Sequence, residues 1–121
     1  MARATLTPTA CTGTTALTLG SSGTQALTGF TGVQFVNNGL MFLVVYTGAS
    51  GAGNVTQNFG RTVEGSIPAP KVQAISNSTN YILGPWSPSD FTAQDGTGLT
   101  YIDFSVVTGN SVTLYELIPV S

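Results

Sequence analysis

The side chains that could carry out chemistry are few in this sequence. It has no histidine, a single cysteine (Cys11) and five carboxylates. Without an imidazole, Ser-His-Asp and Cys-His catalytic arrangements and histidine metal sites are impossible. A pair of carboxylates could serve a glycosidase, but simpler roles fit them. Asp95-Gly96 is typical of a turn, Asp90 suits a first helical turn, and Asp103 and Glu116 are expected to point outward from strands. We therefore expect no enzymatic activity.

Three other features could bind a metal or a cofactor. Oxygen ligands around Asp90, Gln94 and Asp95 would suit Ca²⁺, but their spacing matches no recognisable calcium loop. The glycine-rich segment 48–53 lacks the Lys-Ser/Thr of a phosphate loop and precedes no helix, so we interpret it as a hairpin connection. Cys11 is interpreted as a small apolar packing residue. No cofactor and no metal are expected.

The charge content limits the classes of partner. Charged residues make up 7% of the chain, against roughly 25% in an average soluble domain. The cations are Arg3, Arg61 and Lys71, and the net charge is -2, which is too little positive charge for nucleic-acid binding. Either Thr and Asn hydrate this weakly charged surface, or much of the surface is buried against partners, where unpaired charge would be costly.

No segment predicts membrane association. The longest apolar stretch, Leu40–Tyr46, is far shorter than the ~20 residues of a membrane span. The N-terminal region lacks the continuous apolar run of a signal peptide. We therefore expect synthesis in the cytoplasm and no membrane partner.

The spacing of turn residues predicts an all-β fold. Gly, Asn, Thr and Pro recur at intervals of roughly 8 to 12 residues, as in sandwiches and barrels, and no helical period is evident. We expect a compact antiparallel β-sandwich or barrel-like domain over residues 32–121. Residues 1–31 are rich in Thr and Gly, and we expect them to form thin edge strands or an extended N-terminal arm that contacts a partner.

Several local patterns predict individual elements. Asn37-Asn38-Gly39 lies between two β-rich runs, which predicts a hairpin. Leu40–Tyr46 is apolar at successive positions, which predicts a central strand covered on both faces. Val55 is a candidate core residue. A single helical turn is predicted through Asp90 and Phe91, with Pro88 near its start and Ser87 or Ser89 as its cap. Further short strands are predicted around turns: Lys71–Ser76 with Thr79–Leu83, and Tyr101–Val107 with Ser111–Ile118.

The aromatic residues of the proline-rich loop have two interpretations. Trp86 and Phe91, together with Tyr81 and Tyr101, could form an aromatic platform for a sugar. Alternatively, Trp86 fills one end of the sandwich. The first interpretation predicts a carbohydrate-binding or adhesin-like β-sandwich module.

The segments from Leu43 onward resemble a known family. They read LVVYTGASGAGNVTQNFGRTVEG, GPWSPSDF and DGTGLTYIDFSVVTGNSVTLYEL, and they are similar to the small head proteins of tailed bacteriophages called decoration, cement or minor capsid proteins. The resemblance implies a β-sandwich on the outer surface of the capsid in the virion. It also implies a homo-oligomer, a trimer, that binds the major capsid protein and stabilises the shell. With a sugar-binding aromatic platform, the alternative is a carbohydrate-binding or adhesin-like module of a phage tail or fibre.

The partner-binding residues are expected in two places. The first is the N-terminal arm, since such arms fold on binding and can wrap a large surface. The second is the proline-rich loop. The candidate residues are Arg3, Leu6, Pro8, Leu17, Leu19, Trp86 and Phe91.

Overall fold

The computed structural model describes residues 2–12, 23–60, 69–93 and 97–118, and nearly all of its regular structure is β. The N-terminal strands are short: β1 (Ala4–Thr5), β2 (Thr9–Thr12) and β3 (Gln25–Ala26). The longer strands are β4 (Gly32–Val36), β5 (Met41–Tyr46), β6 (Gly53–Gln57), β7 (Lys71–Ile75), β8 (Asn80–Leu83), β9 (Leu99–Phe104) and β10 (Ser111–Ile118). The described residues contain no helix long and apolar enough to cross a membrane.

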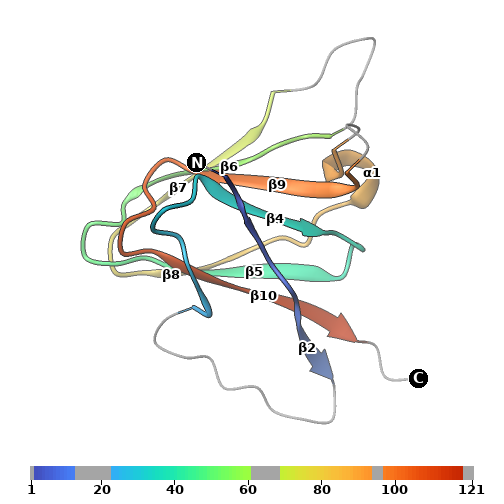
Figure 1. Ribbon diagram of the computed structural model, residues 1–121, viewed down its shortest axis with the longest axis horizontal. Helices are drawn as coiled ribbons and strands as arrows, with labels where there is room; N and C mark the ends of the chain where they lie inside the picture. Colours follow the sequence, from blue (N-terminus) through green and yellow to red (C-terminus); the bar gives the residue numbers. More distant parts are fainter. Residues whose placement is uncertain (1, 13–22, 61–68, 94–96, 119–121) are drawn as a thin grey trace.

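The strands form two sheets that pack face to face as a sandwich, which confirms the predicted fold class. Sheet A has the order β1-β4-β9-β6-β7, and sheet B has the order β2-β10-β5-β8, with β3 also paired to β10. In Figure 1, β4 and β9 of sheet A lie above β5 and β10 of sheet B. Both sheets are mixed, because β1 pairs parallel with β4 and β2 pairs parallel with β10. The antiparallel arrangement that we expected for residues 32–121 is confirmed among the described strands of that range, since β4 to β10 pair with one another only in antiparallel fashion.

The core lies between the sheets and is built by strand alternation. In β9, Ile102 and Phe104 point inward and are buried, and Val112 and Leu114 of β10 meet them from sheet B. Val55 of β6 is also fully buried, as predicted. Alternate residues of a strand face opposite sides of its sheet, so β9 and β10 supply the core with alternate side chains.

Strand β5 is central and covered on both faces, as its apolar sequence predicted. It lies between β10 and β8. Leu43 and Val45 belong to the main core, whereas Val44 and Tyr46 pack with Tyr115 in a second cluster that Cys11 also contacts. The packing role expected for Cys11 agrees with this position.

The predicted Asn-Gly hairpin is wrong, since β4 belongs to sheet A and β5 to sheet B. The connection is an arch between the layers. The Asn37 side chain stabilises it by donating to the backbone oxygen of Trp86 at 3.1 Å and accepting from the Gly39 N–H at 3.0 Å. Gly39 has a φ of 87°, which only glycine adopts freely. The same residues that favour a two-residue hairpin also suit this arch.

The other predicted hairpins are also arches. Strands β7 and β9 lie in sheet A, whereas β8 and β10 lie in sheet B, and segment 48–53 likewise connects β5 to β6 across the layers. Buried Asn110 joins two of these arches. Its side-chain oxygen accepts from the Gly48 N–H at 3.0 Å, and its amide donates to the backbone oxygens of Gly51 and Val106.

The N-terminal residues that the structure describes are edge strands and part of the core. The segment passes from the side of β4 to the side of β10 (Figure 1). Ala4 and Leu6 are buried in the main core, and the Leu6 N–H donates to the Gln34 oxygen at 2.9 Å. Of the two forms that we expected for residues 1–31, the structure shows edge strands at Ala4–Thr5 and Thr9–Thr12. Two buried side chains and strand pairing at both of its ends attach this short segment to the sandwich.

The predicted helical turn is present as α1 (Pro88–Phe91), with Ser87 as the N-cap and proline in the first turn. Pro88 suits this position because its fixed φ matches the helix and its missing N–H would have had no intrahelical acceptor. The turn separates β8 from β9 and places Phe91 against the ring of Phe59, with centroids 4.7 Å apart.

Candidate partner-binding surface

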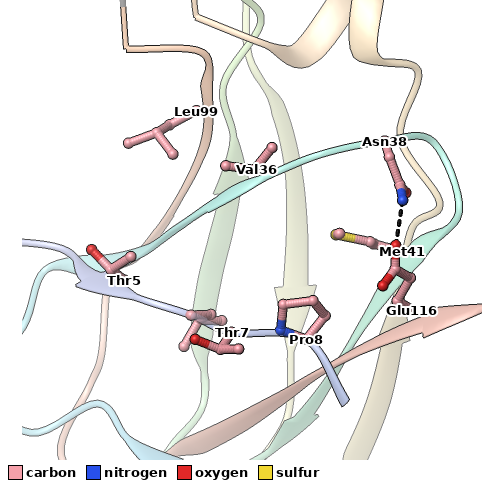
Figure 2. A pocket seen from close by; sticks show the side chains of 9 residues that line it. Thr5, Thr7, Pro8, Val36, Asn38, Met41, Leu99 and Glu116 are labelled. Atoms are coloured by element: carbon pink, nitrogen blue, oxygen red, sulfur yellow. Dashed lines mark hydrogen bonds between the residues drawn. The ribbon is translucent and has the colours of Figure 1, made fainter. Parts of the chain in front are cut away.

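An apolar hollow of about 340 Å³ opens at one end of the sandwich. It lies where both sheets end: Val36 pairs with Leu99 at the end of sheet A, and Met41 pairs with Glu116 at the end of sheet B. The N-terminal segment between β1 and β2 closes the remaining side (Figure 2). The residues that line it are Thr5, Leu6, Thr7, Pro8, Val36, Asn38, Met41, Leu99 and Glu116.

The N-terminal segment shapes this hollow because it changes sheets there. Thr5 is the last residue of β1 in sheet A, and Thr9 is the first of β2 in sheet B. The residues between them cross the gap between the layers, with Leu6 buried and Pro8 half-buried. Proline has no N–H to satisfy, so it suits a crossing segment that leaves both ladders. Two residues predicted to bind a partner, Leu6 and Pro8, thus lie in the hollow.

One exposed apolar side chain forms part of the hollow's rim. Val36 is 64% exposed and belongs to the lining. Leu40 and Leu117 are also exposed, and the Leu117 N–H donates to the Leu40 oxygen at 2.8 Å, but neither residue belongs to the lining. Leu117 follows the inward-facing Glu116 in β10, so strand alternation directs it to the outer face of sheet B. A hollow with an exposed apolar rim at Val36 can accept an apolar side chain from another protein.

The charged residue of the lining is Glu116, and our expectation that it points outward is wrong. In β10, Glu116 belongs to the same set of alternate residues as the buried Val112 and Leu114. Its side chain therefore lies on the inward side of the sheet, at the end of the strand. The Asn38 amide donates to its carboxylate (Figure 2). This alternation was readable from the sequence. Glu116 gives the hollow one negative charge beside its apolar walls.

Arg3 lies outside the hollow, on the outer face of sheet A. Its guanidinium donates to both carboxylate oxygens of Asp103, at 2.6 and 2.8 Å, and lies 4.3 Å from the ring centroid of Tyr101. Asn58 also donates to the Asp103 carboxylate at 3.0 Å. A bidentate pair of this kind orients both groups. Arg3 was predicted to bind a partner, but here it attaches the N-terminal segment to β9.

The proline-rich loop does not present an aromatic platform. Trp86 is only 3% exposed, its ring packs 5.4 Å from that of Phe35, and its indole N–H donates to the Gln57 side chain at 2.6 Å. Of its two interpretations, the one that places Trp86 inside the sandwich is confirmed, and its assignment to partner binding is wrong. Phe91 is half-buried against Phe59. These aromatic contacts are internal and give a carbohydrate-binding module no support.

Several predicted residues lie outside the described parts of the chain. They are Leu17 and Leu19 of the N-terminal region, and Gln94 and Asp95 of the calcium hypothesis. The described residues contain no group of three or more His, Cys, Asp or Glu side chains that could hold a metal ion.

Sequence reasoning missed most of the hollow. Val36 and Met41 were assigned to strands without any binding role, and the predicted strand nearest Leu99 began only at Tyr101. The signal that could have found Val36 is its position, since it flanks a turn and so lies at a strand end, where the opposite sheet no longer covers a side chain.

In comparisons with known proteins, no family model matches the chain, and no curated protein or solved structure is significantly similar to it.

Proposed function

We propose that this chain is a structural virion protein that binds the outer surface of a tailed-phage capsid and stabilises the shell, with the major capsid protein as its partner. The observation that carries the proposal is the apolar hollow with its exposed rim. Its lining combines Leu6, Met41 and Leu99 with exposed Val36. Binding another protein would remove this apolar surface from water, which stabilises the complex by roughly 25 cal/mol per Å² of buried apolar area.

The low charge of the chain supports a role in protein binding. Protein interfaces have cores depleted of charged residues, and this chain has only 7% of them. The described carboxylates of the strands are engaged, Asp103 by Arg3 and Glu116 by Asn38. We therefore propose a non-catalytic role.

The phage assignment rests on the resemblance of three segments to phage head proteins. In the fold, those segments include β5, α1, β9 and β10, which form much of the scaffold. The trimer that the resemblance implies is part of the proposal, as is a place on the outer surface of the virion. A structural protein of this kind binds no nucleic acid and no membrane.

A pair of lysine substitutions tests the proposed surface. Val36→Lys places a charge on the rim of the hollow, whereas Ile82→Lys places one on β8, which contributes nothing to the lining. The two side chains are matched, at 64% and 67% exposure. Binding to empty capsids of the phage that encodes the chain is measured by co-sedimentation.

We expect Val36→Lys to weaken binding by about tenfold or more, which corresponds to ~1.4 kcal/mol, and Ile82→Lys to change it by less than about twofold. Unchanged binding of a folded Val36→Lys protein would refute the hollow as the contact. Failure of the folded parent protein to bind any such capsid would refute the function itself.

A further inference from the structure

Strand β7 ends sheet A with an edge whose backbone pattern can be worked out from its neighbours. On β6, the Asn54 oxygen accepts from the Ser105 N–H, and the Asn58 N–H donates to the Tyr101 oxygen, so both residues direct their backbone groups toward β9. The N–H and C=O of one strand residue point to the same side. The intervening residues of β6, Val55 and Gln57, therefore direct theirs toward β7.

The register then identifies the backbone groups at the outer edge of β7. Val55 lies opposite Gln73, and Gln57 lies opposite Lys71. The backbone groups of Gln73 and Lys71 are therefore hydrogen-bonded to β6. Val72 and Ala74 must direct their N–H and C=O groups away from β6. The Gln73 amide donating to the Ala74 oxygen at 3.1 Å agrees with this. Among the described residues, no strand pairs with that outer edge.

The side chains of β7 leave this edge accessible. Lys71, Val72, Gln73 and Ala74 are all exposed, and Val72 is 55% exposed. Edge strands of soluble proteins are commonly protected by charge, proline or a covering segment. Here the described protection consists of one lysine at the start of the strand. An edge of this kind recruits an extended backbone.

We propose that this edge pairs with β7 of a second copy of the chain, antiparallel about a two-fold axis at Gln73. In this register Val72 lies opposite Ala74 of the partner copy, and both residues direct their backbone groups toward each other. Each of the two such pairs exchanges two hydrogen bonds, giving about four in all. In this register the outward-directed backbone groups of Val72 and Ala74 in one copy meet those of the other, and the Ala74 oxygen, which already accepts from the Gln73 amide, accepts a second hydrogen bond.

The side chains also favour this register. Val72 and the opposing Ala74 form an apolar pair on one face, and the two copies of Gln73 face each other across the axis. The two copies of Lys71 lie four positions apart along the strands, about 13 Å, so like charges are not opposed. This two-fold contact joins copies in pairs, so it is separate from the contacts of the proposed trimer and does not depend on the shell-binding proposal. It continues sheet A from one copy into the next.

Cysteine trapping tests the register directly in the isolated protein. Gln73→Cys is made in a Cys11→Ser background, which removes the native thiol. Opposed residues of a non-hydrogen-bonded pair have Cα atoms about 4.5 Å apart, within the range of a disulfide. Lys71→Cys is the matched control, since it is exposed on the same face of the same strand but about 13 Å from its copy.

We expect mild oxidation to convert Gln73→Cys to a covalent dimer at least about fivefold faster than Lys71→Cys, measured on non-reducing gels. Ala74→Pro in the Gln73→Cys background removes an N–H that bonds the second copy while sparing the ladder to β6, and it should reduce this rate. Equal rates for the two cysteine variants, or a folded Ala74→Pro variant that cross-links as fast as its parent, would overturn the proposal.

Discussion

Truncating Leu6 tests whether the N-terminal segment belongs to the folded domain. Leu6 is 9% exposed, belongs to the main core cluster and lines the hollow. Leu→Ala substitutions at buried sites cost about 2–5 kcal/mol, the smaller values occurring where little new cavity forms. Because one side of Leu6 already faces the hollow, we expect Leu6→Ala to lower the free energy of unfolding by about 2–3 kcal/mol.

The assay is urea unfolding followed by the fluorescence of the single tryptophan, Trp86, with Leu117→Ala as the control. Leu117 is 47% exposed, so its truncation should cost less than about 0.5 kcal/mol. If the segment were a detached arm, Leu6→Ala would be as mild as the control. A loss below about 0.5 kcal/mol for Leu6→Ala would therefore refute its place in the core.

Three further changes test the interior and the pH dependence of stability. Gln57→Leu leaves the buried Trp86 N–H without its acceptor and should cost about 1–3 kcal/mol in urea unfolding. A cost near zero would contradict this contact. The buried Thr100 hydroxyl has no hydrogen-bond partner among the described residues. Thr100→Val should therefore increase the free energy of unfolding by about 1 kcal/mol and raise the thermal midpoint. A lower midpoint would contradict the burial of an unpaired hydroxyl at this position. Burial raises the pKa of Tyr115, with a further contribution from Tyr46. The folded state therefore resists ionisation of this phenol, and stability should fall as the pH rises above about 10, where the unfolded chain ionises first. Tyr115→Phe should show a smaller fall between pH 9 and 11 in thermal unfolding, and an equal fall would refute the assignment.

The strands were largely predictable because strand alternation and turn residues are local signals. Leu40–Tyr46 predicted the central β5, and the position of Pro88 predicted α1. The sheet to which each strand belongs was not predictable in this way. Asn37-Asn38-Gly39 suits a hairpin and an arch equally well, and only contacts distant in sequence, such as that of Asn37 with Trp86, distinguish them.

The candidate site was less predictable than the fold. Leu6 and Pro8 were selected as partner-binding residues in an arm, and the structure places them in the hollow because the segment crosses between the sheets. The remaining walls come from residues far apart in sequence, such as Val36 and Leu99, which meet through strand pairing. Trp86 was selected as a partner-binding residue, but the structure places it in the core. An aromatic residue in a loop can be a core residue when the loop folds inward.

The proposed function requires that a tailed phage encode the chain, and its most direct test is mass spectrometry of purified particles of that phage. A shell-stabilising protein should be present in those particles at a fixed ratio to the major capsid protein after extensive washing. Absence of the chain from intact particles, while it is abundant in the lysate from which they were purified, would contradict the proposed role in the virion.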